Sequence, residues 1–279
     1  MIIKILRFIK KIIWVIIPPP NIPRTYSSSG EDAIVSFLLS DMHKSSVITY
    51  LEIGTGSPDG GNNTYLFYTL GSSGVCVEAD KSLIPRIKKT RPRDKVYNVG
   101  VTAESEKEAD FYVFSYGINT FDKEEAKVRA SSGRFKLLEV VKVPLVNINS
   151  LIKENFKTYP DLLAIDIEGV DLAVLKTLDY KSYPIPIIIV ETCLYSENHI
   201  HEKDYAPIEF MESIGYQVYA DTYTNTIFVN KDWFNKVGAA STASKNIPDY
   251  AVFAGAPAKE VATRTQNLSY NLDYRPFLN

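Results

Sequence analysis

Two carboxylates spaced two residues apart, Asp166 and Glu168, have the types and spacing for acid–base chemistry. They stand at the end of residues 162–167, an apolar run that predicts a buried strand. Side chains alternate along a strand, so both carboxylates point the same way and can share one proton or bind a cation. We expect Asp166 to act as a general base or to orient the substrate, with Glu168 in support. Alternatively, Glu168 caps the helix that follows.

Three further candidates follow the next apolar run, residues 187–190. Glu191 comes directly after this run and is expected to face the same cleft. His199 and His201 form an HxH pair near two glutamates, a set that can bind a divalent cation or supply the base. The alternative is that they are exposed loop histidines, and we assign no metal site.

A glycine-rich turn precedes these groups in the chain. Residues 47–53 predict a strand, which stops at Gly54 and Gly56 before a helix-like segment. Glycine lets a loop lie close to a ligand where a Cβ would collide. The next strand, residues 74–77, ends at Glu78, where nucleotide-binding α/β folds place an acid on the ribose hydroxyls. Because the turn is not a GxGxxG loop, it favours an adenosine ligand without a pyrophosphate, such as S-adenosylmethionine.

These groups need a sheet to bring them together. Strand-like and helix-like segments alternate over residues 26–235, which predicts an α/β domain whose sheet is covered by helices on both faces. Residues 217–221 and 226–230 have the pattern of a closing hairpin. Residues 117–133 are polar and charged, and we expect a mobile lid or substrate loop there, or else a solvated surface.

The chain resembles the FkbM-type S-adenosylmethionine-dependent methyltransferases. The matching pieces, in the family's order, are SSGEDAIVSFL (28–38), YLEIGTGSPDGGNNTYLFYTLGSSGVCVEAD (50–80), YNVGV (97–101), INTF (118–121), DLLAIDIEGVDLAVL (161–175) and IIIVET (187–192). One departure is Gly56, where many members carry Ala followed by Asn. The combination of pieces is specific, although no single piece is.

This resemblance implies a Rossmann-like class I methyltransferase fold, with a mostly parallel seven-stranded sheet and an antiparallel last strand. It implies S-adenosylmethionine as the cofactor and makes the acidic motif of Asp166 and Glu168 a hallmark of the site. On the same basis, Asn119 and Thr120 contact the cofactor or the substrate. The residues expected to bind the cofactor are Glu52, Gly54, Gly56, Asn63, Thr64, Glu78 and Asp80.

The composition fits one substantial globular domain with appendages, since 45% of the 279 residues are hydrophobic and 23% are charged. A net charge of -2 argues against general nucleic-acid binding, which needs a basic excess. Cys76 and Cys193 lie in apolar, strand-like runs and are expected to be small core residues. Without a framework of cysteine pairs, a reducing, cytoplasmic compartment is favoured.

The first segment of the chain is basic and amphipathic. Residues 1–17 contain no acid and four cations, which are Lys4, Arg7, Lys10 and Lys11. On a helix these cations share about a third of the circumference, and apolar side chains fill the rest. We expect this helix to lie on the cytoplasmic face of a membrane without spanning it; alternatively, it packs on the domain or on a partner. Residues 18–25 are expected to form a stiff proline-rich spacer.

The last segment, residues 236–279, departs from the alternating pattern. Around IPDY (247–250) and GAPAK (255–259) it resembles the closing coil of hexapeptide-repeat acyltransferases. No run of hexapeptide repeats precedes it, and one coil cannot bury a core. We therefore expect a remnant that packs on the domain or mediates homo-oligomerisation, and no acyltransferase site.

These patterns combine into one principal hypothesis. We expect O-methyl transfer from S-adenosylmethionine to a sugar hydroxyl of a surface glycan or glycolipid precursor, a step of polysaccharide biosynthesis at the membrane surface. A divalent cation at the site is left open. The alternatives are methylation of a soluble natural product, and a membrane-tethered scaffold that keeps the fold without catalysis.

Overall fold

The structure is a computed structural model, and it describes residues 25–43, 47–102, 107–167, 169–194, 202–238, 251–254 and 259–263. The chain divides into two compact units, Met1–Asn230 and Lys231–Asn279. Several predicted features lie outside the described residues: the amphipathic helix of residues 1–17, all but the last residue of the 18–25 spacer, Glu168, His199 and His201.

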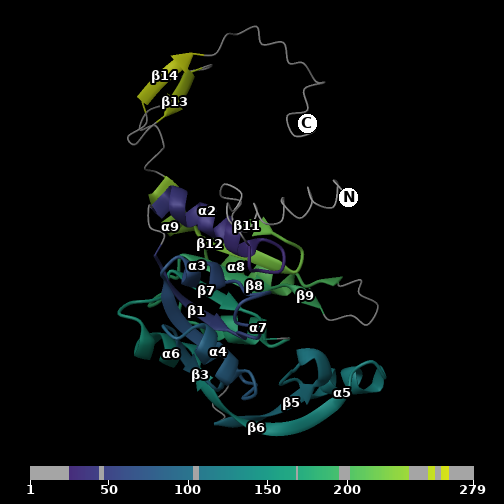
Figure 1. Cartoon of the computed structure of the whole chain (residues 1–279). Coiled ribbons are helices and arrows are strands. Elements are labelled where there is room, and N and C mark those ends of the chain that lie inside the picture. The colour runs from purple at the N-terminus through teal and green to yellow at the C-terminus, as the bar shows by residue number, and fades with distance from the viewer. Residues whose placement is uncertain are drawn as a thin grey trace, which may run out of the picture. The chain divides into compact units, whose positions relative to one another are not determined.

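A seven-stranded sheet forms the middle of the first unit (Figure 1), with strand order β11-β12-β8-β7-β1-β2-β3. The strands are β1 (Thr49–Ile53), β2 (Ser73–Val77), β3 (Lys95–Tyr97), β7 (Leu162–Ile165), β8 (Ile187–Glu191), β11 (Tyr216–Asp221) and β12 (Asn225–Asn230). Neighbours run parallel except at β12, which is antiparallel to both β8 and β11. The predicted class I methyltransferase fold, with its antiparallel last strand, is confirmed.

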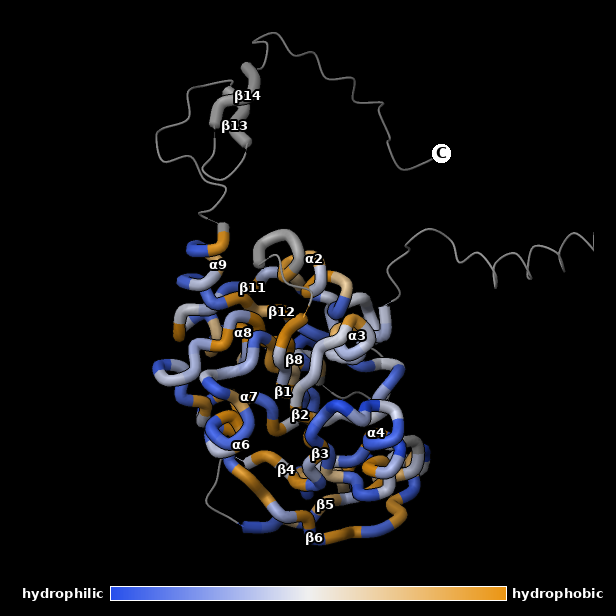
Figure 2. The backbone as a smooth tube through the Cα atoms, turned by 60° about the vertical axis from the view of Figure 1, so that its left-hand side comes forward, coloured by the Kyte–Doolittle hydropathy of each residue, from blue (hydrophilic) through white to orange (hydrophobic). Residues whose placement is uncertain are grey.

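Helices cover both faces of this sheet. Figure 2 shows α6, α7 and α8 on one side of the central strands and α3 and α4 on the other. Helix α2 lies beside α3, and α7 contacts both α6 and α8. The helices are α2 (Glu31–His43), α3 (Tyr65–Thr69), α4 (Ile84–Thr90), α6 (Ile148–Asn155), α7 (Asp171–Thr177) and α8 (Ala206–Ser213).

Strand register builds the core between the sheet and α6, α7 and α8. Leu51 pairs with Val75 on one side and with Leu163 on the other, and all three side chains are buried. Because side chains alternate along a strand, the residues two positions further on face the same way and continue the apolar row. The helix side chains that complete this core are Ile148, Leu151, Ile152, Val174, Leu175 and Met211.

A smaller sheet, with strand order β4-β6-β5, lies between β3 and β7 in the chain. Its strands are β4 (Gly100–Thr102), β5 (Glu108–Phe114) and β6 (Leu137–Asn147). The segment expected as a lid or solvated surface, residues 117–133, contains helix α5 (Lys123–Ser131), which follows a 3₁₀ turn, η1 (Ser115–Gly117). The Asp122 side chain accepts the N–H of Glu125 at 2.8 Å, so a helix cap begins α5.

A short hairpin, β9 (Cys193–Leu194) and β10 (Glu202–Lys203), follows β8. Both cysteines are free thiols. Cys76 is buried in β2, as predicted, but the core position expected for Cys193 is wrong. Cys193 is half-buried because it lies in this hairpin beyond the end of β8, and its thiol donates to the carbonyl of Tyr223 at 3.1 Å.

The second unit contains helix α9 (Lys231–Gly238) and an antiparallel hairpin of β13 (Ala251–Ala254) and β14 (Lys259–Thr263). Most of the residues that carry the acyltransferase resemblance, 247–250 and 255–258, lie outside the described part, so that resemblance stays a prediction. Among the helices that the structure describes, none combines the length and the apolar character needed to cross a bilayer.

Candidate active site

Most of the predicted catalytic and ribose-binding positions lie in one row across the carboxyl edge of the sheet. Ile53 pairs with both Val77 and Ile165, and Ile165 pairs with Val190. The residues that follow these four are Gly54, Glu78, Asp166 and Glu191. Since neighbouring strands lie about 4.8 Å apart, the row brings together residues from distant parts of the chain.

A pocket of about 800 Å³, counting the part open to solvent, lies at this edge. One side consists of the strand ends, and the opposite side consists of residues from β4, β5 and the segment before α5. We call residues 117–121 of that opposite side the wall. The predicted residues that line the pocket are Gly54, Gly56, Glu78, Asn119, Thr120 and Asp166.

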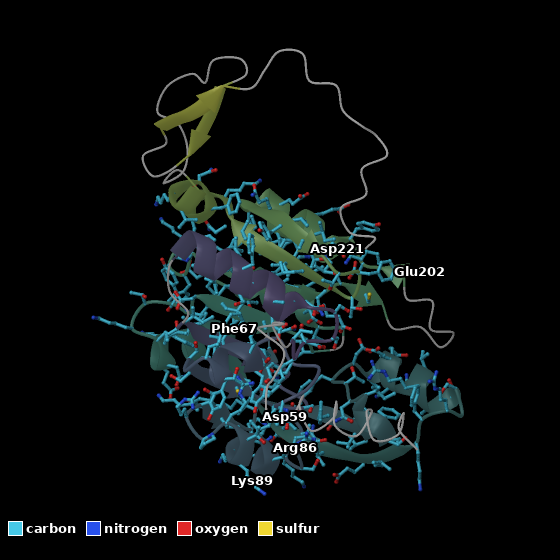
Figure 3. All side chains as sticks on the ribbon, turned by 45° about the horizontal axis from the view of Figure 1, so that its top comes forward. Asp59, Phe67, Arg86, Lys89, Glu202 and Asp221 are labelled. Carbon is cyan, nitrogen blue, oxygen red and sulfur yellow. The ribbon has the colours of Figure 1, made fainter. Side chains whose placement is uncertain are left out.

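The glycine turn forms a tight cradle for a ligand. Gly54 has φ +84°, and a Cβ added to it would lie 1.7 Å from the carbonyl oxygen of Asp166. Its backbone therefore lies directly against the loop that follows β7. That loop leaves no room for a side chain, so only glycine fits at this position. The outer part of the turn is held to α4 by an exposed ion pair, Asp59 with Arg86 at 2.6 Å (Figure 3).

Glu78 is buried at the pocket, with 7% of its surface exposed. One carboxylate oxygen accepts the N–H of Gly56 at 2.7 Å, and the other accepts the N–H of Asp80 at 2.8 Å. Burial raises the pKa of Glu78, and these backbone donors oppose that shift. Each oxygen keeps a lone pair that can accept a hydrogen bond from a ribose hydroxyl, so these acceptors and the glycine turn both fit S-adenosylmethionine.

A buried ionic network joins the residues on either side of the glycine turn. The Arg91 guanidinium, 0% exposed, donates to Glu52 at 2.9 Å, to Asp94 at 2.7 Å and to Thr64 at 2.6 Å. Glu52 and Thr64 therefore lie in this network and do not line the pocket. Asn63 does not line it either, so the predicted cofactor contacts of these three residues stay predictions.

Asn62, which the sequence analysis did not select, links the turn to helix α3. Its side-chain oxygen accepts the N–H groups of Thr64 and Tyr65 at 3.1 and 2.9 Å, and its amide donates to the carbonyl of Thr55 at 3.2 Å. Arg91 also donates to the Asn62 oxygen, at 3.1 Å. An asparagine just before a helix is a capping signal that the sequence does contain.

The loop after β7 presents Asp166 to the pocket. Its side chain is exposed, and its N–H donates to the carbonyl of Ile53 at 3.0 Å. Asp171, a residue not selected from the sequence, is 6% exposed and accepts the N–H groups of Ile167 and Gly169, each at 3.2 Å. A buried carboxylate at the start of α7 thus fixes the loop that carries Asp166.

Glu191 ends β8 in the same row and is half-buried, but it does not line the pocket. Within the described residues, no three His, Cys, Asp or Glu side chains are grouped so that they could hold a metal ion. Glu168, His199 and His201 lie outside that part of the chain, so the divalent cation stays a prediction.

The wall is tied to the cofactor side of the pocket through Asn119. Its side-chain oxygen accepts the N–H of Phe114 at 2.9 Å, and its amide donates to Asp80 at 3.1 Å. Asp80 does not line the pocket; it holds the wall residue that does. Phe121 packs on Phe111, with ring centroids 4.7 Å apart, and lies so close to Gly100 that a Cβ there would be 2.5 Å from its ring.

The solved structures that resemble the chain at low similarity include two methyltransferases. An O-methyltransferase from Bacillus cereus in complex with SAH is 12% identical, with a TM-score of 0.37 over 79% of this chain and 95% of that one. A 1,6-didemethyltoxoflavin-N1-methyltransferase from Burkholderia thailandensis is 10% identical, with a TM-score of 0.35 over 72% and 77%. Similarities this low say nothing about what this chain acts on.

No curated protein matches the chain. A family model, the methyltransferase FkbM domain, matches residues 53–218. The match includes the glycine turn from Gly54, the acid Glu78, the wall and the loop of Asp166, which together form the pocket. The chain therefore belongs to the FkbM family of S-adenosylmethionine-dependent methyltransferases.

Proposed function

We propose that this enzyme is an O-methyltransferase in which Asp166 takes the proton of an acceptor hydroxyl. The observation that carries the proposal is that Asp166 lines the same pocket as Gly54 and Glu78, one strand away from the glycine turn. An alcohol must lose its proton as it attacks, so a base within hydrogen-bond reach is needed. S-adenosylmethionine, when bound, supplies an electrophilic methyl group.

Apolar side chains elsewhere in the pocket support this chemistry. The apolar part of the pocket's lining includes Ile53, Ile167, Phe111 and Phe121. Apolar walls exclude water, which strengthens the attraction between a base and the proton that it removes. Asp171 holds the loop of Asp166 through two backbone N–H groups, so the backbone that carries the base has a fixed position.

The acceptor that we propose is a sugar hydroxyl of a surface glycan or glycolipid precursor at a membrane. This part of the proposal rests on the sequence of residues 1–17, whose cations and apolar residues suit an anionic membrane surface. Deleting residues 1–17 should release the enzyme from the membrane fraction while cofactor binding is kept. Unchanged fractionation of the shortened protein would remove the argument for a lipid-linked acceptor.

Transfer of labelled methyl from S-adenosylmethionine to a panel of glycan and lipid-linked sugar acceptors tests the function. Asp166→Asn should keep cofactor affinity within a few-fold and lower turnover by about 10²- to 10⁴-fold, as expected for loss of a general base. Asp161→Asn is a matched control. Asp161 precedes the same strand, β7, at the end away from Asp166, and its carboxylate accepts the N–H of Thr49. Full turnover by Asp166→Asn would exclude Asp166 as the base.

A further inference from the structure

Helix α5 carries a fully buried cation next to the pocket. The Arg129 side chain is 0% exposed, and one of its terminal nitrogens donates to the carbonyls of Ile118 at 2.5 Å and Asn119 at 3.3 Å. Those two carbonyls belong to the wall, and Asn119 is one of its pocket-lining residues. Arg129 thus holds the backbone of the wall from behind.

Glu125 joins this cation to the loop of the acidic motif. Its Oε1 accepts the other terminal nitrogen of Arg129 at 2.5 Å. Its Oε2 accepts the hydroxyl of Thr120 at 3.3 Å, and a Cβ added to Gly169 would lie 3.1 Å from that same oxygen. Gly169 follows Asp166 in the same loop, so Glu125 bonds to the wall and lies close to this loop.

A second ion pair on the same helix, by contrast, is exposed to solvent. Lys127 and Glu124 lie 2.6 Å apart, with 60% and 77% of their side chains exposed. An exposed pair of this kind contributes little, whereas a buried guanidinium is costly unless its hydrogen bonds are made. Arg129, which is buried, and Glu125, which is half-buried, bond to each other and to residues 118–120 of the wall.

We propose that Arg129 and Glu125 are positioning residues, which hold the wall against the loop of Asp166 and so set the affinity for the cofactor. Arg129 acts through the carbonyls before Thr120, and Glu125 acts through the hydroxyl of Thr120 itself. The inference rests on the proposed function only in that the pocket must bind the cofactor; the ordering of the wall is a property of the free enzyme.

Hydrogen exchange of the wall amides, without ligand, tests the ordering directly. In Arg129→Met the amides of residues 118–121 should exchange about 10-fold faster than in the wild type, while the strands β1, β7 and β8 keep their protection. Lys127→Met, on the same helix, is the matched control and should leave both sets unchanged. Equal exchange at 118–121 in all three proteins overturns the proposal, as does a uniform loss of protection across the core strands, which would mean a general structural role.

Calorimetric titration with S-adenosylhomocysteine gives the second readout. Arg129→Met and Glu125→Gln should weaken binding by about 10-fold or more, as expected for a misplaced pocket wall. Arg129→Lys keeps the charge but cannot reach two carbonyls and a carboxylate at once, so its affinity should lie between those of Arg129→Met and the wild type. Wild-type affinity in folded Arg129→Met overturns the proposal. A wild type that does not bind contradicts the proposed function, and the exchange experiment then decides the ordering alone.

Discussion

The two sides of the pocket are held by different kinds of contact. On the sheet side, strand register places Gly54 and Asp166, and the turn rests on the buried network of Arg91. On the opposite side, two backbone hydrogen bonds join Thr120 to Tyr112 of β5, and the rest of the wall depends on individual side chains, among them Asn119 and Arg129. We therefore expect changes on the sheet side to lower both stability and binding, and changes in the wall to lower binding with little loss of stability.

The largest effect should come from Gly54→Val on the sheet side. A Cβ at this residue would lie 1.7 Å from the carbonyl of Asp166, and the φ of +84° adds backbone strain. We expect no measurable cofactor binding and a loss of roughly 3 kcal/mol or more in the free energy of unfolding, measured in urea. Gly56→Ala is the control, because it has φ +54° but no atom within 4 Å of its Cβ, and it should cost about 1–2 kcal/mol. Equal losses in both variants would mean that the contact with Asp166 is not the cause.

Arg91→Met should come next, since it removes the cation that pairs with the buried carboxylates of Glu52 and Asp94. Breaking a buried ion pair in this way costs about 3–5 kcal/mol of unfolding free energy. Arg86→Met removes an ion pair with Asp59 that is exposed to solvent, and it should cost at most about 1 kcal/mol. If denaturation shows the same small change for both, the network does not support the turn.

The pH dependence of cofactor affinity tests the role of Glu78 on the sheet side of the pocket. Burial raises its pKa above the ordinary value, and only the ionised carboxylate offers both oxygens as strong acceptors. Cofactor affinity should be full at neutral pH and fall as the pH decreases through this raised pKa. Because the folded state binds this proton more readily than the unfolded state, the contribution of Glu78 to stability grows as the pH falls. Protonation of Glu78 therefore does not unfold the protein, and the loss of affinity at low pH is not caused by unfolding at this group.

Glu78→Gln supplies the control for that pH series. The variant cannot titrate, and its amide nitrogen would face one of the two backbone donors, Gly56 or Asp80. Its affinity should be about 10-fold lower or more at neutral pH and independent of pH over the same range. A variant that follows the same pH curve as the wild type would show that another group titrates.

Asn119→Ala should have the smallest effect and act mainly on binding. It removes the hydrogen bonds to Phe114 and Asp80, worth about 1 kcal/mol, or roughly five-fold in cofactor affinity. Calorimetry measures the affinity, and urea denaturation should show little change. A loss of stability as large as that of Arg91→Met would make the wall part of the core and end the contrast between the two sides.

The sheet side of the site was predictable because local patterns determine it. Apolar runs that stop at Gly54, Glu78 and Glu191 gave three strand ends, and parallel register brings such ends to one edge. The strand predicted over 162–167 ends earlier, at Ile165, so Asp166 lies in the loop that follows it. The supporting residues were not predictable in the same way. Arg91 lies in a basic stretch of the chain that suggests a solvated surface, and only the fold places it under the glycine turn, against Glu52.

The wall shows the limit of sequence patterns more strongly. Residues 117–133 are polar, so neither helix α5 nor the burial of Arg129 follows from hydrophobic periodicity. The cap at Asp122 was visible as an acid three residues before Glu125, but a cap gives the start of a helix and not what the helix covers. The role of Asp80 is a second case, since its contact with Asn119 joins residues far apart in the sequence.

Calorimetric titration of S-adenosylmethionine into the wild type and into Glu78→Ala tests the central claim most directly. The pocket at the strand ends is predicted to bind one cofactor in the wild type, and the loss of the buried carboxylate should weaken binding by about 10- to 100-fold. A folded wild type that does not bind, or a folded Glu78→Ala that binds as tightly as the wild type, would contradict the assignment of this pocket as the cofactor site.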